Sequence, residues 1–191
     1  RAHRQAEALD ESLRRLGLEY IDLYLIHWPV PDCFVESWAV MEKALDAGKV
    51  RTIGVSNFHP HHLDTLLAET DVVPAVNQVE FHPRLTQWDV VRYCRDKGIQ
   101  YEAWSPLVRG QMDDLEPVQR IARKVGRTPA QVILRWDLQH EIVTIPKSTD
   151  AGRIAENAAL FDFTLTAEQM AEIDALDAGE RIGPDPDNFH F

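Results

Sequence analysis

The chain has 191 residues, of which 45% are hydrophobic and 27% are charged, a composition typical of a folded globular protein. Acidic residues outnumber basic ones by 31 to 20, and the resulting net charge of -11 disfavours nucleic acid and anionic membranes as partners. No membrane span is predicted, because the apolar runs fall far short of the roughly 20 residues that a membrane helix needs. We also expect no signal peptide, since the first residues include no apolar stretch. A small-molecule partner fits this composition best.

The two cysteines, Cys33 and Cys94, do not form a paired pattern. A disulfide framework is therefore not expected, and the reducing cytoplasm is the predicted location.

Hydrophobic residues alternate along the chain between helical stripes and short apolar runs, with glycines between them. Leu9, Leu13 and Leu16 form the first helical stripe, and Gly17 is expected at its C-terminal end. Further helices are predicted near residues 38–45, 60–68, 88–96, 116–124 and 129–139, with a short one after residue 150. The apolar runs predict strands near residues 20–26, 52–56, 75–80, 100–104 and 142–145.

Two helix starts have a clear local signature. Thr128 precedes Pro129, and Gln131 follows three positions after Thr128, which predicts a capping box at the start of a helix. Thr166 and Gln169 repeat this pattern for a last helix that we expect to end near residue 176.

Strands that alternate with helices predict parallel βαβ units of the α/β class. An open dinucleotide-binding sheet would have a Gly-x-Gly-x-x-Gly run after its first strand, and this sequence contains none. The pattern therefore favours a (β/α)8 TIM barrel, which has eight strands in about 250 residues. We read residues 1–191 as a single domain and expect the first roughly three βα units to be absent from this chain.

Polar or aromatic residues follow each predicted strand, where parallel barrels have their active sites. Lys147, Ser148 and Arg153 lie around the start of a short helix and predict a phosphate site. Asn57 and Gln78 are either buried amides that hold loops or groups that bind a carboxamide. Trp104 is either a core residue or a flat platform for an aromatic ring such as nicotinamide. The other residues at these strand ends are His27, Trp28, Ser56, Glu80 and Ser105.

The sequence does not favour two other kinds of site. His59, His61 and His62 surround Pro60 at a helix start, but no carboxylate or cysteine lies at a recognised ligand spacing, so no metal site is predicted. A hydrolase with a serine nucleophile is not predicted, since no serine lies in a Gly-x-Ser-x-Gly motif between a strand and a helix.

Several blocks of the sequence resemble, in the same order, the signature blocks of the aldo-keto reductase family, particularly bacterial members such as 2,5-diketo-D-gluconate reductases. The blocks are DLYLIHWP at 22–29, GKVRTIGVSNF at 48–58, NQVEFHP at 77–83, and IPKS at 145–148 followed by RIAEN at 153–157. The resemblance implies that an aldehyde or ketone is reduced by hydride transfer from NADPH, with a tyrosine as proton donor.

The resemblance also implies roles for individual residues. His27 corresponds to the family's catalytic histidine, and Trp28 would contact the substrate. The residues expected to bind the cofactor are Ser56, Asn57 and Gln78 at the carboxamide, Trp104 at the nicotinamide ring, Ser105 and Leu107 along the pyrophosphate, Lys147, Ser148 and Arg153 at the 2′-phosphate, and Glu156 and Asn157 at the adenine.

The family's aspartate, tyrosine and lysine have no counterpart in this sequence, so we expect the chain as written to be inactive. A complete enzyme whose other strands lie outside the sequence is the preferred interpretation. The alternative is a non-catalytic fragment that binds a nucleotide or a protein partner. We expect a small carbonyl compound as substrate and a monomer or weak homo-oligomer as the assembly.

Overall fold

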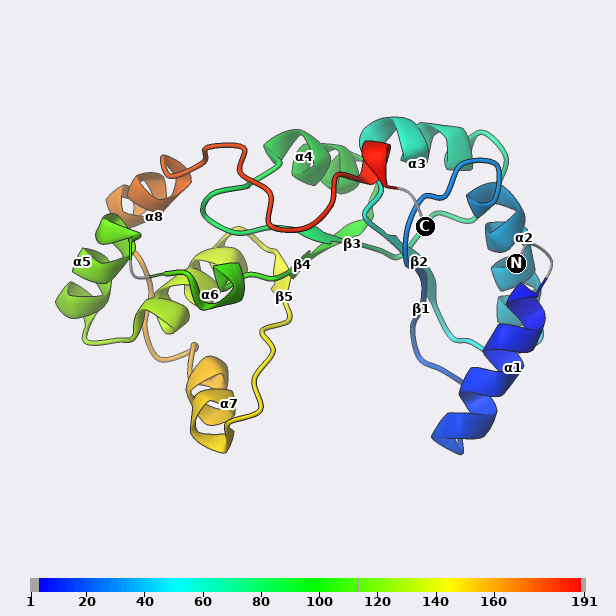
Figure 1. Cartoon of the computed structure of the whole chain (residues 1–191), viewed down its shortest axis with the longest axis horizontal. Coiled ribbons are helices and arrows are strands. Elements are labelled where there is room, and N and C mark those ends of the chain that lie inside the picture. Colours follow the sequence, from blue (N-terminus) through cyan, green and yellow to red (C-terminus); the bar gives the residue numbers. More distant parts are fainter. Residues whose placement is uncertain (1–3, 113, 190–191) are drawn as a thin grey trace. The chain divides into compact units, whose positions relative to one another are not determined.

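The computed structural model describes residues 4–112 and 114–189 (Figure 1). Its five strands are hydrogen-bonded in the order β1-β2-β3-β4-β5. In chain order the elements are α1 (Gln5–Leu16), β1 (Tyr24–Ile26), α2 (Phe34–Asp46), β2 (Ile53–Ser56), α3 (Pro60–Leu67), β3 (Val76–Glu80), α4 (Trp88–Asp96), β4 (Gln100–Trp104), the 3-10 helix η1 (Val108–Gly110), α5 (Glu116–Val125), α6 (Pro129–Gln139), β5 (Val143–Thr144), α7 (Ala151–Ala158), α8 (Ala167–Asp174) and the 3-10 helix η2 (Pro186–Asn188).

The alternation of helices and parallel strands confirms the predicted α/β class. β4 has the predicted bounds, whereas β1 and β5 are shorter than the apolar runs suggested. At β1, Ile21 pairs with Val50 only in an isolated bridge, and the ladder begins at Tyr24. At β5, the N–H of Ile145 still donates to the carbonyl of Ala103 at 3.3 Å, but Pro146 has no N–H to continue the ladder.

The predicted helix ends are confirmed. Thr128 Oγ1 accepts from the N–H of Gln131 at 3.2 Å, and Gln131 Oε1 accepts from the N–H of Thr128 at 3.1 Å. Thr166 and Gln169 make the same reciprocal pair at the start of α8. Gly17 ends α1 in the left-handed region, with φ of 66°, a conformation that glycine adopts at little cost.

The described chain separates into two compact units. The first unit comprises residues 4–78, 89–100 and 186–189, and the second comprises residues 79–88, 101–112 and 114–185. Among the described residues, no helix combines the length and apolar character that a membrane crossing requires.

The core of the first unit lies where α1 and α2 pack together and where α2 packs on β1 and β2, as can be followed in Figure 1. Trp38, Phe58 and Leu63 are at most 1% exposed in this core. Cys94 is also fully buried, and burial raises the pKa of its thiol to about 11, although a hydrogen bond from Asn77 acts in the opposite direction. The thiol is therefore protonated at neutral pH and serves as a packing group.

The core of the second unit is built around Trp136 of α6, which is fully buried. Its ring stacks on Phe81 with centroids 5.0 Å apart, and its Nε1 donates to Asp174 Oδ1 of α8 at 2.7 Å. Helix α6 also packs against α5, β5 and α7, so one buried helix connects most elements of this unit.

Candidate functional site

The carboxyl ends of β1, β2 and β3 are tied together by a network of hydrogen bonds within the first unit. Ser56 Oγ donates to the carbonyl of Gln78 at 2.7 Å, and the backbone N–H of Asn57 donates to the same carbonyl at 2.9 Å. Asn57 Nδ2 donates to the carbonyl of His27 at 3.0 Å and to Ser56 Oγ at 3.1 Å. The network brings four of the predicted site residues together, and it shows that the amide of Asn57 holds the loop after β1.

Asn57 adopts the left-handed backbone region, with φ of 65°. Asparagine tolerates this region better than most residues other than glycine. Since Ser56 and Asn57 are only 2% and 3% exposed, their conformation is fixed by the surrounding protein.

His27 and Trp28 directly follow β1 and differ in exposure. The His27 side chain is exposed, whereas Trp28 is only 9% exposed. The Trp28 indole stacks on the Phe189 ring, with centroids 4.1 Å apart and planes inclined by 13°. The aromatic position predicted to contact substrate is therefore partly covered by a residue of the C-terminal segment.

The loop after β4 in the second unit has an unusual backbone. Ser105, Val108 and Arg109 have φ values of 54°, 51° and 51°, all in the left-handed region. This region is especially unfavourable for a β-branched residue such as Val108, whose side chain is fully buried. Residues held in such conformations cluster at ligand sites, which makes this loop a candidate for binding.

A pocket of about 700 Å³ lies within the second unit, beside this loop and the starts of α6 and α7. Seven of the residues predicted to bind a cofactor line it, namely Ser105, Leu107, Lys147, Ser148, Arg153, Glu156 and Asn157. Trp104 ends β4 immediately before this group and is half-buried. Ser56, Asn57 and Gln78 belong to the first unit and form their own cluster.

The pocket carries more positive than negative charge, although the chain as a whole is acidic. Arg109, Lys147 and Arg153 line it together with one carboxylate, that of Glu156. Glu156 Oε1 accepts a hydrogen bond from Thr128 Oγ1 at 2.8 Å, so this carboxylate connects α7 to the start of α6. The two arginines and the lysine therefore give the pocket a locally positive character that suits an anionic ligand.

Two side chains that precede α7 form hydrogen bonds with the backbone at its start. Asp150 accepts from the N–H of Arg153 at 2.8 Å, and Ser148 Oγ accepts from the N–H of Asp150 at 3.1 Å. These bonds place Lys147 and Ser148 next to the positive end of the α7 dipole.

Sequence reasoning noted Glu80 as a polar strand end but did not predict its role. Glu80 is 1% exposed, and its carboxylate accepts from the N–H groups of Ile182 at 2.6 Å and Gly183 at 3.1 Å. His82 Nε2 lies 3.0 Å from the same carboxylate. Burial alone would raise the pKa of Glu80, but the hydrogen bonds from His82, Ile182 and Gly183 outweigh it and lower the pKa below its usual value. Glu80 thus anchors the C-terminal segment.

Sequence reasoning also missed some pocket residues. Arg109, Gln119 and Thr128 line the pocket, although only Thr128 had been singled out, and then as a helix cap. The available signal for Arg109 was its basic side chain two residues after Leu107, in the loop that follows a predicted strand. The sequence also did not indicate that Asp187 lies beside the three histidines at the start of α3.

Comparison with known proteins identifies the family. The family model described as "Aldo/keto reductase family" matches residues 1–178. The uncharacterized oxidoreductase YtbE of Bacillus subtilis is 54% identical over 184 residues, which is 96% of this chain and 66% of that protein. The glyoxal reductase of the same organism is 56% identical over 184 residues, which is 96% of this chain and 67% of that protein.

A solved structure agrees with these sequence matches. The crystal structure of a Gox0644 mutant in complex with NADPH is 40% identical, with a TM-score of 0.95 over all of this chain and 71% of that one. The chain therefore belongs to the aldo/keto reductase family, as its sequence blocks indicated, and it spans about two thirds of the length of the curated relatives.

Proposed function

We propose that this chain is the cofactor-binding part of an NADPH-dependent carbonyl reductase that acts on small aldehydes or ketones. The observation that carries the proposal is the pocket of about 700 Å³, which seven residues implied by the family resemblance line together. Family membership and the NADPH complex of a structural neighbour support the same function.

The pocket suits the phosphate-rich end of NADPH. The 2′-phosphate would be held by the guanidinium of Arg153, the ammonium of Lys147 and the hydroxyl of Ser148, because all three are hydrogen-bond donors that line one pocket. The hydrogen bond from Thr128 fixes the Glu156 carboxylate, which would face the adenine together with Asn157. This donor set favours NADPH over NADH.

The family resemblance assigns the network residues at β1 to β3 to the nicotinamide end of the cofactor. Ser56, Asn57 and Gln78 would orient the carboxamide, and Trp104 would support the nicotinamide ring. When bound, the nicotinamide supplies a hydride to the carbonyl carbon of the substrate. His27, whose carbonyl is held by Asn57, would direct its exposed imidazole toward the substrate oxygen, and Trp28 would contact the substrate.

The proposal includes a complete (β/α)8 barrel whose remaining strands and proton-donating tyrosine lie outside this sequence. Two features of the described residues support it. β1 and β5 are the terminal strands of the sheet order, and the side chains of Tyr24, Leu25 and Ile26 are only half-buried. Strands of this kind are suited to pairing with further strands.

Two measurements on the purified chain test the proposal. Titration with NADPH, followed by the fluorescence of the nicotinamide, should show saturable binding that is tighter than that of NADH. Loss of NADPH absorbance in the presence of a small aldehyde such as glyoxal then measures turnover, which we expect only in a version extended to the length of its relatives. A chain that does not bind NADPH contradicts the proposal.

The second candidate is a fragment that binds the nucleotide without catalysis, because the family's aspartate, tyrosine and lysine have no counterpart in this sequence. NADPH binding without turnover, both in this chain and in a version extended to the length of its relatives, would favour this candidate. Turnover by the extended version alone would favour the reductase.

A further inference from the structure

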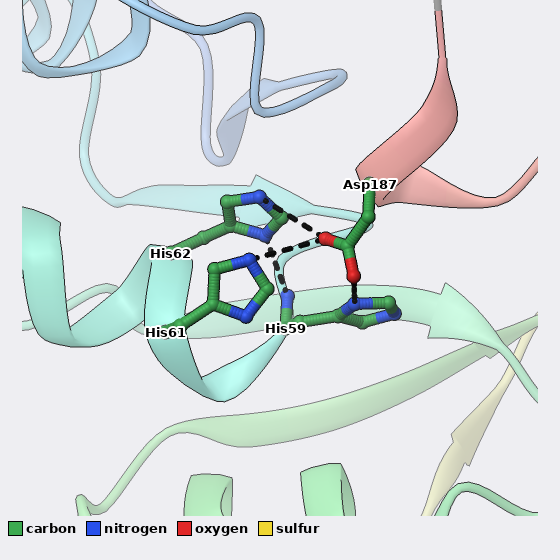
Figure 2. Close-up of side chains that lie close together, drawn as sticks. All are labelled: His59, His61, His62 and Asp187. Atoms are coloured by element: carbon green, nitrogen blue, oxygen red, sulfur yellow. Dashed lines mark hydrogen bonds and ion pairs between the residues drawn. The ribbon is translucent and has the colours of Figure 1, made fainter.

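Three histidines at the start of α3 surround one carboxylate of the C-terminal segment (Figure 2). His59 Nδ1 lies 3.1 Å from Asp187 Oδ2, and His61 Nε2 lies 3.1 Å from Asp187 Oδ1. His62 Nε2 lies 3.4 Å from Asp187 Oδ1. All four residues belong to the first unit, and one ligand atom from each lies within 4.8 Å of the others.

His62 is bound differently from the other two histidines. Its Nδ1 accepts the backbone N–H of His59 at 3.1 Å, which caps the start of α3. A neutral imidazole that accepts at Nδ1 carries its proton on Nε2. That N–H faces Asp187, so His62 orients the carboxylate instead of offering a lone pair to an ion.

His59 and His61 each have a ring nitrogen directed at one carboxylate oxygen. Two ligand atoms on the same zinc ion, each at about 2.0–2.2 Å, are roughly 3.4 Å apart in tetrahedral geometry. The two distances of 3.1 Å, one to each oxygen of the carboxylate, are close to that value, and the ligand atoms all lie within 4.8 Å of one another. Side-chain movements that draw these atoms together would replace the hydrogen bonds with bonds to one ion. Two imidazoles and one carboxylate form a donor set that suits zinc and its first-row neighbours.

We propose that His59, His61 and Asp187 bind one divalent transition-metal ion, with His62 as the residue that positions Asp187. The ion would connect η2 to the start of α3, which lie far apart in the sequence. It would also hold Phe189, two residues after Asp187, in its stack on Trp28. The site is separate from the residues proposed to bind NADPH.

Zinc binding to the untagged, chelator-treated chain tests the proposal by isothermal titration calorimetry and thermal unfolding. We expect one Zn²⁺ per chain, a rise in Tm with zinc concentration, and no such effect with Mg²⁺, which prefers oxygen ligands. His61→Ala and Asp187→Asn should each weaken zinc binding about 100-fold or more. His61 is 62% exposed and Asp187 is 43% exposed, so both variants should fold, which circular dichroism can verify.

Variants of His62 separate a positioning residue from a ligand. In the His62→Gln variant the new side-chain amide can still accept from the backbone and donate to Asp187, so zinc affinity should stay within about threefold. His62→Ala should lose roughly 10- to 100-fold, the usual effect of removing a partner of a metal ligand. Equal large losses in His62→Gln and His61→Ala would contradict the positioning role.

His140→Gln is the matched control, because His140 also lies beside a carboxylate, 2.9 Å from Asp174, but outside the cluster. Its zinc stoichiometry and affinity should equal those of the unaltered chain. Zinc binding that is absent at about 100 µM, or that is unchanged in both His61→Ala and Asp187→Asn, would overturn the proposed site.

Discussion

The exposed guanidinium of Arg153 projects from the first turn of α7 at the edge of the pocket. A phosphate on the 2′-oxygen is the group that distinguishes NADPH from NADH, and a planar guanidinium binds such a phosphate through two parallel hydrogen bonds. Discrimination between the two cofactors should therefore depend strongly on this residue.

Arg153→Ala should raise the Kd for NADPH by about 10- to 100-fold, since a hydrogen bond to a charged group contributes about 1.5–3 kcal/mol. The Kd for NADH should change by less than about threefold. Fluorescence titration of both cofactors measures the two constants. Arg123→Ala, which removes an exposed arginine that does not line the pocket, is the control. Equal losses for both cofactors would refute the assignment of Arg153.

Gly183 is closely packed between two groups of the second unit. A β-carbon at this position would overlap the Trp104 ring and lie 3.2 Å from Glu80 Oε2. Gly183→Ala should therefore lower the free energy of unfolding by about 1–3 kcal/mol, as overpacking usually does. Urea denaturation measures the change. In the Trp104→Phe background the smaller ring should relieve part of the loss, and strictly additive effects would argue against the clash.

At the scale of single residues, seven residues that the sequence singled out line one pocket, because strand ends and family blocks are both local patterns. Their roles in cofactor binding remain predictions. The sequence did not predict the partners of Glu80 or of the histidines at the start of α3. His59 and Asp187 are 128 positions apart, and no spacing rule relates residues that only the folded chain brings together.

Among the elements, α6 and α8 start with the same capping box but in different surroundings. Thr128 caps α6 and also donates to the half-buried Glu156, whereas Thr166 caps α8 and also hydrogen-bonds to the exposed Glu168. Thr166→Ala should cost about 1 kcal/mol of stability. Thr128→Ala should cost about 1 kcal/mol more, because it leaves the half-buried Glu156 without that donor, whereas the exposed Glu168 can bind water instead.

Thermal or urea unfolding of the two variants under the same conditions gives the comparison. Circular dichroism should show native helical content for both before unfolding. A Thr166→Ala variant that is as unstable as Thr128→Ala, or more so, would mean that the hydrogen bond to Glu156 adds nothing to the cap.

Helix ends were predicted more accurately than strand ends, because the interactions that fix them connect residues closer together in the sequence. Caps and glycine ends were correct because they depend on neighbours within a few residues. The ends of β1 and β5 were predicted too long because a strand ends where its partner's hydrogen bonds end, as at Pro146. An apolar run in the sequence does not indicate where the neighbouring strand begins or ends.

For the molecule as a whole, Asp137 makes stability depend on pH. Its side chain is fully buried in the second unit, and burial raises the pKa of the carboxyl well above its ordinary value. Between the ordinary and the raised pKa the folded chain holds a proton that the unfolded chain has lost, so stability falls as pH rises through this window.

Asp137→Asn should remove this dependence, because the amide does not titrate and has nearly the same shape. Urea denaturation at a series of pH values from about 4 to 8 should give a smaller decline in unfolding free energy for the variant than for the unaltered chain. Asp162→Asn, at an exposed aspartate of the same unit, is the control. Parallel pH profiles for the unaltered chain and Asp137→Asn would contradict the prediction.

At this scale the sequence predicted the α/β class and the family but not the separation into two compact units. Hydrophobic periodicity reports which face of each element is buried, and it does not report which elements pack together. The complete barrel and the single domain remain predictions.

The anchoring of the C-terminal segment by Glu80 also has a consequence for the order in which this protein is made. Ile182 follows Glu80 by 102 residues, so a ribosome that adds about 5–20 residues per second produces this partner roughly 5–20 s later. During that interval the Glu80 carboxylate lacks the backbone donors that compensate for its burial. The nascent second unit must therefore keep this strand end hydrated, and it completes its packing only when residues 182 and 183 have left the ribosome.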